Sequence, residues 1–324
     1  MTEIGTRLEL FVDDELIESL RGARRQLQHP VLMPSEPGAV PVSYSTVWLE
    51  DGRYRRYQRD VRPTYHGEKY DGHPGELTVL LESRDGIRWR RPRLGLFEVN
   101  GSCNNSVVLA GTNKCSHNFT PFVDANPGAT RAARYKALGG VHRGGGLYAW
   151  RSVDGITWRK VQTAPVITHD AFSFDSQNVS FWSEAEGCYV CYFRTWETSN
   201  GRLRSISRTT SADFRSWSRP VPMDPNLPRE HLYTSGTHPY YRARHQYIAT
   251  PTRFMPDRGE STDILFMSCR AGAERFDRSF THAFIRPGMD AERWGNRANY
   301  AAWQIWPTSD RELSLYVNDR RYTL

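Results

Sequence analysis

The sequence predicts an all-β fold, a five-bladed β-propeller, from two observations. The first is a short phrase with a leading serine and a closing aromatic residue, which occurs at Ser83–Trp89, Ser152–Trp158, Ser211–Trp217 and, in a degenerate form, Ser268–Phe276. Its serines are 69, 59 and 57 residues apart, which is typical of arrays that repeat one supersecondary unit. The second is that runs rich in β-branched and aromatic residues, bounded by turn residues, fill the intervals.

The recurring phrase predicts a turn rather than a catalytic group. Asp-Gly, found in the first two copies, accepts the positive φ of a tight hairpin. The serine and aspartate side chains can bond to nearby backbone amides, and the tryptophan can anchor the turn on a neighbouring strand. We therefore assign Asp85, Asp154 and Asp213 to structural turns at the rim of the propeller, between the third and fourth strands of a blade.

Five units share one order of strand-like runs and turns. They begin at Ser45–Leu49, near His117, at Gln177–Trp182, near Thr234 and at Asn299–Trp303. Five units of four strands make a propeller, in which radial repetition leaves only short, protected sheet edges.

We expect residues 1–324 to form this single domain. The last unit is incomplete, and the apolar run at 7–12 is predicted to be a strand that could close it. The chain stops abruptly after Leu324, which leaves room for a further C-terminal region.

The composition argues against a membrane protein and a secreted protein. No apolar run approaches the roughly 18 residues that a spanning helix needs, and Met1–Leu10 lacks the basic and apolar regions of a secretory signal. We expect a cytoplasmic protein with reduced thiols. Cys188 and Cys191 lie three apart in a strand-like run, so their side chains should point to opposite faces and share no metal.

The charge pattern argues against nucleic acid as a partner. The formal net charge is +7, but the arginines are scattered, and no helix-turn-helix, zinc or aromatic-basic pattern is present. The aromatic share of 12% suits a cleft that binds a small carbohydrate. The oligomeric state stays open.

Two strings, together with the serine-led turns, carry a resemblance to a known group. Asn100–Leu109 and Arg134–Lys136 resemble the five-bladed propeller glycoside hydrolases, loosely families 32 and 43, over roughly Val31–Phe284. The resemblance implies a carbohydrate-active hydrolase with acidic residues around an axial funnel. The usual trio, an Asp in each of the first two blades and a Glu in the third, has no match here, because the first inner run opens Val42–Ser45 without an acid.

Glycoside cleavage requires two carboxyl groups, one as an acid and one as a nucleophile or base. Asp175 is the first candidate, because it lies in a dense polar stretch directly before the third inner run; the alternative is a turn cap. Glu230 is a candidate acid, and His231 a candidate base or substrate contact, unless both lie in a surface loop. His117, which opens the second unit, is a further catalytic candidate.

Arginines and polar residues at the ends of the inner runs are candidates for substrate binding. Arg194 and Arg253 could bind the carboxylate of an acidic sugar such as a uronate, or hold Asp175 or Glu230 ionised. Trp196 could stack on a sugar ring. The remaining candidates share a place near the inner strands: Glu36, Asp60, Gln177, Asn178, Tyr233 and His238. A salt bridge is the alternative for Asp60, and a satisfied core histidine for His238.

Three functions fit this pattern. The first is a glycoside hydrolase acting on an oligosaccharide or glycoside. The second is a polysaccharide or oligosaccharide lyase, in which His117 or His231 works with Tyr233 beside a uronate. The third is a non-catalytic carbohydrate-binding propeller, because fold does not determine function. No cofactor is expected, although an axial ion such as calcium could bind through His117, Asp175 or His238.

Overall fold

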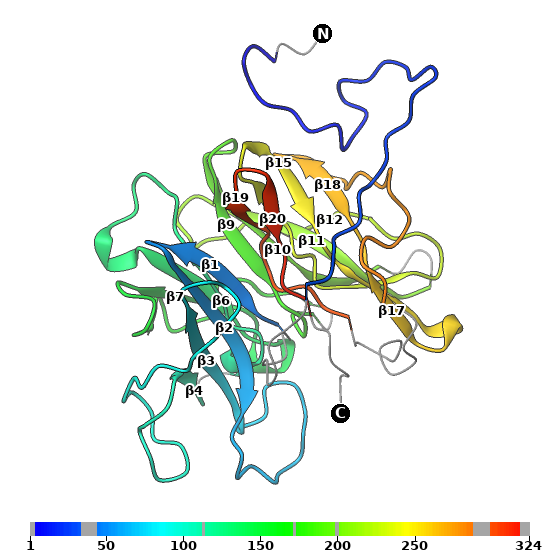
Figure 1. Ribbon diagram of the computed structural model, residues 1–324. Coiled ribbons are helices and arrows are strands. Elements are labelled where there is room, and N and C mark those ends of the chain that lie inside the picture. Colours follow the sequence, from blue (N-terminus) through cyan, green and yellow to red (C-terminus); the bar gives the residue numbers. More distant parts are fainter. Residues whose placement is uncertain are drawn as a thin grey trace.

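The computed structural model describes residues 4–33, 44–111, 114–170, 173–197, 201–287 and 299–317. These residues form antiparallel sheets joined by loops, which confirms the all-β class and gives a β-propeller (Figure 1). The helical pieces within these ranges are single 3-10 turns: η1 (Cys115–His117), η2 (Arg131–Ala133), η3 (His142–Gly144) and η4 (Pro256–Arg258). None of these turns has the length or apolarity to cross a membrane.

Three four-stranded sheets follow one another, and each pairs its strands in chain order. The first sheet contains β1 (Thr46–Glu50), β2 (Arg53–Val61), β3 (Glu76–Ser83) and β4 (Val107–Ala110). The second contains β5 (Thr120–Val123), β6 (Tyr135–Gly139), β7 (Tyr148–Ser152) and β8 (Arg159–Lys160). The third contains β9 (Val179–Ser183), β10 (Cys188–Glu197), β11 (Leu203–Ser211) and β12 (Val221–Pro222).

The fourth region divides into two three-stranded sheets. One contains β14 (His238–Tyr240), β15 (Ala243–Ala249) and β18 (Met267–Arg270), and the other contains β13 (His231–Tyr233), β16 (Thr252–Met255) and β17 (Ser261–Ile264). The hairpin of β19 (Trp306–Ser309) and β20 (Glu312–Ser314) follows. That the propeller has five blades therefore stays a prediction.

The first strands of the sheets meet in a circle. β1 contacts β5, β5 contacts β9, and β9 contacts β14. Trp303 closes the circle, because it bridges to Thr46 and its indole Nε1–H donates to the carbonyl oxygen of Thr237 at 2.9 Å. Gln177 ties the third sheet to the first, since its Nε2–H donates to the carbonyl oxygen of Ser45 at 3.0 Å. The residues that precede these strands are thereby gathered at one place.

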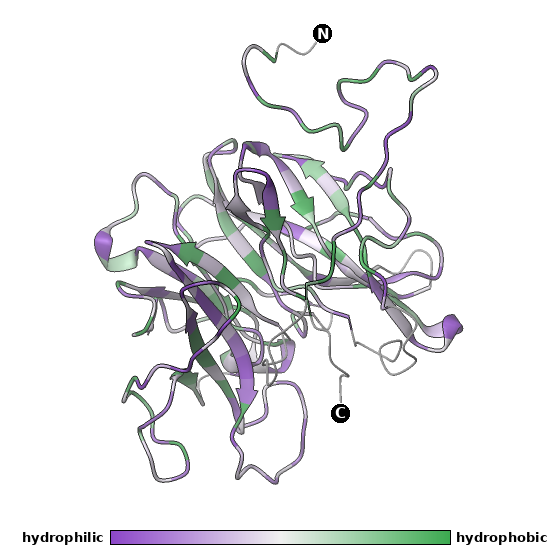
Figure 2. Ribbon diagram, in the orientation of Figure 1, coloured by the Kyte–Doolittle hydropathy of each residue, from purple (hydrophilic) through white to green (hydrophobic). Residues whose placement is uncertain are grey.

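Aromatic side chains fill the space between neighbouring sheets. The ring centroid of Trp48 lies 4.6 Å from that of Tyr57 and 5.8 Å from that of Tyr135 in the second sheet. Phe181 of β9 and Tyr247 of β15 are 5.1 Å apart. Full burial of a large apolar side chain stabilises a fold by roughly 1.5–3 kcal/mol, so these contacts hold the sheets together. Figure 2 shows hydrophobic positions interspersed with hydrophilic ones along the strands.

The serine-led phrase forms the predicted turn. In the second sheet the Ser152 hydroxyl accepts the Gly155 amide at 2.9 Å, and Asp154 Oδ1 accepts the amides of Ile156 and Thr157 at 2.7 and 2.8 Å. Gly155 has a φ of 73°, and a Cβ there would lie 2.7 Å from the Tyr57 hydroxyl. The turns at Ser83 and Ser211 repeat these bonds.

The degenerate copy is used differently. The Ser268 hydroxyl donates to the carbonyl oxygen of Val12 at 3.3 Å. The predicted strand at 7–12 is wrong, because these residues form no strand. They lie instead against β15 and β18, where the Leu10 amide donates to Gln246 Oε1 at 2.7 Å and Arg270 Nε donates to Asp13 Oδ2 at 2.8 Å. Side-chain bonds, rather than a β ladder, hold this segment.

Replacing Asp154 should destabilise the fold. Asp154→Ala leaves two backbone amides of the turn without their acceptor, and we expect the free energy of unfolding to fall by about 1–3 kcal/mol. Urea denaturation measures the loss. Asp310→Ala, which removes an exposed carboxylate, is the control and should change this free energy by less than about 0.5 kcal/mol. Equal effects of the two variants would contradict the assigned role.

Candidate active site

Eight residues near the ends of strands form a closed circle of contacts, which we call the axial ring. Seven of them make both of their contacts through side chains, and Asp175 contacts His117 through its backbone carbonyl oxygen. The axial ring joins residues that lie more than 250 positions apart (44 and 300). Its members, in order of contact, are Tyr44, His117, Asp175, Arg194, Trp196, Arg204, Tyr233 and Tyr300.

Tyrosines make up one arc of the axial ring. Tyr44 lies 5.8 Å from the imidazole of His117 and 5.6 Å from Tyr300, between ring centroids. Tyr300 lies 6.3 Å from Tyr233. All of these pairs meet edge to face, the arrangement that aromatic quadrupoles favour. The arc brings three phenol rings from the first, fourth and last units to one place.

Arginines stacked on Trp196 make up the opposite arc. The guanidinium carbons of Arg194, Arg202 and Arg204 lie 5.0, 4.7 and 4.8 Å from the centroid of Trp196. Arg204 also lies 4.7 Å from the ring of Tyr233, which joins the two arcs. Cation–π contacts of this length are favourable, so they fix the orientation of the indole at the end of β10.

Asp175 is held at the ring from both sides. Arg194, whose side chain is fully buried, forms an ion pair with its carboxylate, and that carboxylate remains 18% exposed. The preceding Phe174 is buried with a φ of 70°, a strained conformation for a residue with a side chain. Asn118 of the second sheet donates to the carbonyl oxygens of Phe174 and Ser176. These bonds hold the Asp175 loop at the axial ring.

His117 connects the first sheet to the Asp175 loop. Its Nδ1 lies 2.8 Å from Glu76 Oε1, and its Nε2 lies 3.0 Å from the carbonyl oxygen of Asp175. Arg59 approaches the same imidazole at 3.0 Å and stacks on Tyr44 at 4.9 Å. With only 2% of its surface exposed, His117 is placed to position Asp175 rather than to contact a substrate.

A second carboxylate lies beside the same imidazole. Asp71 Oδ1 is 3.7 Å from His117 Nε2, and its side chain is 50% exposed. Because Asp175 and Asp71 approach one nitrogen atom, one through its carbonyl oxygen and the other through its carboxylate, the two residues are neighbours. A third carboxylate, that of Glu76, contacts the other nitrogen, Nδ1, but it is buried. Its second oxygen accepts the Gly72 amide at 3.1 Å.

Sequence reasoning missed several members of this site. Tyr44 and Tyr300 precede inner strands and carried no charge to single them out. Arg59 directly precedes the chosen Asp60. Glu76 opens a strongly apolar strand, and an acid at the buried entry of such a strand is costly unless it has a partner; this signal could have found it.

Glu230 and Arg253 lie in an ion-pair network with Arg278 and Asp263. Arg278 reaches both oxygens of Glu230, at 2.9 and 3.1 Å. Arg253 pairs with Asp263 through two bonds of 2.9 and 2.6 Å. Since Glu230 is buried with its charge satisfied, we leave Glu230 and Arg253 out of the proposed site.

Other predicted residues have structural contacts. Burial and the Arg204 guanidinium lower the pKa of His231, whose Nδ1 accepts the Arg204 amide at 3.2 Å. Asp60 pairs with Arg91 at 2.7 Å on the surface, which is the salt bridge that the sequence left open as its alternative role.

Two of the remaining polar candidates have a structural role. Gln177 and Asn178 are buried and bond to backbone carbonyl oxygens, so they shape the inner circle. Glu36 lies outside the described residues. Among the residues that the structure describes, no cluster of three or more His, Cys, Asp or Glu side chains could hold a metal ion.

His238 is a neutral core histidine. Its Nδ1–H donates to the carbonyl oxygen of Gly236 at 2.9 Å, and its Nε2 accepts the amide of Ile305 at 3.2 Å. Burial lowers its pKa to about 4. These bonds connect β14 to the segment before β19 and help to close the circle of inner strands.

Comparisons with known proteins show the fold. Neither protein-family models nor curated protein sequences give a match. Among solved structures, the chain is similar to an N-acetylgalactosamine deacetylase from F. plautii in complex with blood group B trisaccharide, with 13% identity, 90% of this chain and 83% of that chain covered, and a TM-score of 0.59.

Two further structures are similar over comparable lengths. One is a β-1,2-mannobiose phosphorylase from Listeria innocua, with 10% identity, 89% of each chain covered and a TM-score of 0.59. The other is an α-L-arabinofuranosidase from Clostridium thermocellum, with 12% identity, 80% of this chain and 77% of that chain covered, and a TM-score of 0.50.

The buried His238 predicts a loss of stability on acidification. Its pKa is 6.5 in the unfolded chain and about 4 in the fold, so unfolding takes up a proton between these values. The contribution is complete above pH 6.5 and falls as the pH drops toward 4, by on the order of 3 kcal/mol in total.

The measurement is the unfolding free energy of wild type and of His238→Gln, by urea denaturation at each pH. The glutamine cannot titrate and still offers an acceptor to the Ile305 amide. The difference in unfolding free energy between wild type and variant should shrink as the pH falls from 6.5 to 4. A difference that is constant over this range would contradict the assignment.

Proposed function

We propose that this chain is a carbohydrate-active enzyme that hydrolyses a glycosidic bond at the axial ring. The observation that carries the proposal is the closed ring itself, in which Asp175 lies among aromatic side chains and arginines. Aromatic faces pack against the apolar faces of sugar rings, and a carboxylate supplies the reacting group. The fold likeness to proteins named for acting on saccharides supports the proposal.

Asp175 would serve as the nucleophile or as the base toward water. The buried Arg194 holds its carboxylate in an ion pair, and that carboxylate remains 18% exposed. Asp71, which lies beside the same imidazole nitrogen, would act as the acid that protonates the leaving oxygen. His117 would be a positioning residue, since Glu76 and the Asp175 carbonyl oxygen occupy its two nitrogens.

The substrate would carry an acidic group, such as the carboxylate of a uronate. Arg202 is exposed at the ring, stacks on Trp196 and has no carboxylate partner among the described residues. A guanidinium group held on an aromatic face is suited to bind a carboxylate with two bonds. Trp196 would then contact the sugar ring, and Arg202 its charged substituent.

Hydrolysis is favoured over elimination by the contacts of the histidines. A lyase would need a base with an open nitrogen, but His117 has an oxygen at each nitrogen, and the Nδ1 of His231 accepts the Arg204 amide. Asp175 and Asp71, which approach the same imidazole, would supply the two carboxyl groups that glycoside hydrolysis uses.

Asp175→Asn should abolish hydrolysis. On a panel of nitrophenyl glycosides and uronate-containing oligosaccharides, followed by reducing-sugar release, we expect kcat to fall by about a hundredfold or more. Asp60→Asn, which removes a surface carboxylate, is the matched control and should retain activity. Full activity of Asp175→Asn would remove Asp175 from the site, and a product that absorbs in the ultraviolet would indicate a lyase.

Trp196→Ala should weaken substrate recognition. Loss of the aromatic contact is expected to lower kcat/KM roughly tenfold, mainly through KM, because such contacts contribute about 0.5–1.5 kcal/mol beyond area burial. Trp196→Phe should restore much of the loss. If Trp196→Ala has wild-type kinetics and unchanged thermal stability, the indole does not contact the substrate.

A further inference from the structure

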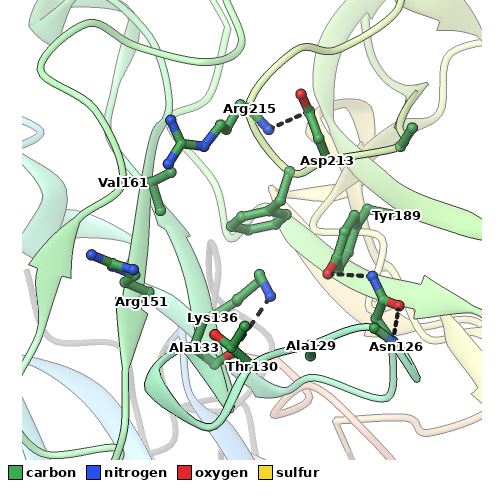
Figure 3. Close-up of a pocket in the computed structure, with 13 residues that line it drawn as sticks. Asn126, Ala129, Thr130, Ala133, Lys136, Arg151, Val161, Tyr189, Asp213 and Arg215 are labelled. Carbon is green, nitrogen blue, oxygen red and sulfur yellow. Dashed lines mark hydrogen bonds between the residues drawn. The ribbon is translucent and has the colours of Figure 1, made fainter.

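A cavity, separate from the axial ring, lies between the second and third sheets. It has a volume of about 310 Å³ and opens to solvent between η2 and the serine-led turn of the third sheet (Figure 3). Tyr189 lines it at the start of β10, whereas Arg194 of the axial ring lies five residues further along that strand. At about 3.3 Å per residue, the two sites are roughly 16 Å apart along β10.

The floor of the cavity is a fixed polar network. Lys136, whose side chain is 91% buried, pairs with the fully buried carboxylate of Asp124. The Tyr189 hydroxyl donates to the same carboxylate at 2.9 Å and accepts Asn126 Nδ2–H at 3.0 Å. The ammonium of Lys136 also lies 5.2 Å from the centroid of Tyr189. This network is rigid and neutral, and Figure 3 shows Lys136, Tyr189 and Asn126 around the cavity.

The rim of the cavity carries uncompensated positive charge. Arg151 and Arg215 line it, and Arg159 is paired with Arg151 across β7 and β8. None of the three forms an ion pair with a described residue. Asp213 also lines the cavity, but its Oδ1 accepts the amides of Arg215 and Ser216, both at 2.8 Å.

Those amide bonds fix Asp213 in the turn. They lower its pKa, with the Ser216 amide as the largest cause. One carboxylate thus faces two lining arginines, and a third arginine stands next to them. In the view of Figure 3, Arg151 and Arg215 lie on the same side, next to Val161.

We propose that this cavity binds a small polar molecule that bears one anionic group, a carboxylate or a phosphate. Arg151 and Arg215 bind the anion, since guanidinium groups match the geometry of both. The Asn126 amide and the Thr130 hydroxyl, which also line the cavity, bind polar substituents. The volume is at the lower end of that of ligand sites, which suits a sugar acid or a sugar phosphate of monosaccharide size.

Calorimetric titration tests the proposal with glucuronate, glucose 6-phosphate and glucose as probes, at low ionic strength. The two anionic probes distinguish a carboxylate from a phosphate ligand, and at least one should bind more tightly than glucose. In the double variant Arg151→Gln/Arg215→Gln, the affinity for that probe should fall at least tenfold. Arg84→Gln, an exposed arginine in the equivalent turn of the first sheet, should leave it unchanged.

A further variant separates this cavity from the axial ring, where the proposed function also expects a uronate to bind. Binding of the anionic probe that persists in Trp196→Ala and is lost in Arg151→Gln/Arg215→Gln belongs to the cavity. Circular dichroism confirms that each variant is folded. The proposal is overturned if neither anion binds, if glucose binds equally well, if the double variant binds like wild type, if Arg84→Gln weakens binding to the same extent as the double variant, or if Trp196→Ala abolishes all binding of the anionic probe.

Discussion

The closure of the inner strands into a circle is the constraint on which the rest of the structure depends. Trp303 makes the last connection, because its backbone bridges to Thr46 and its indole Nε1–H donates to the carbonyl oxygen of Thr237. Once the circle closes, Tyr44 and Tyr300, at opposite ends of the chain, lie 5.6 Å apart between ring centroids. Sheets that stood in a row would leave these residues on separate edges, and no axial ring could form.

Buried ion pairs fix the positions of the residues in the axial ring. Burying Arg194 or Glu76 alone would cost several kcal/mol, so each is found with a partner of opposite charge. His117 joins the two pairs, because it contacts Glu76 on one side and the Asp175 loop on the other. The polar centre is therefore one network that links the first, second and third sheets, and it limits the positions that Asp175 can adopt.

The same strand serves two chemically different places. The far end of β10 supplies Arg194 and Trp196 to the axial ring, and its start supplies Tyr189 to the cavity beside the second sheet. At the ring, Arg194 forms an ion pair with Asp175, and Arg194, Arg202 and Arg204 stack on Trp196. At the rim of the cavity, Arg151 and Arg215 form no ion pair with a residue that the structure describes, which is the basis for proposing an anionic ligand there.

Local chemistry, written in the sequence alone, determined the all-β class, the serine-led turns and the position of Asp175 before the third inner strand, because turn bonds and strand periodicity act between near neighbours. It also indicated Arg194, Trp196 and Tyr233. Only the tertiary structure decided which charges pair. Glu230 and Asp175 looked alike in sequence, but Arg278 binds both oxygens of Glu230, whereas Arg194 holds Asp175 at the axial ring. Each arginine comes from a different segment of the chain than its carboxylate, so the pairing depends on how the chain folds in space and not on any local pattern.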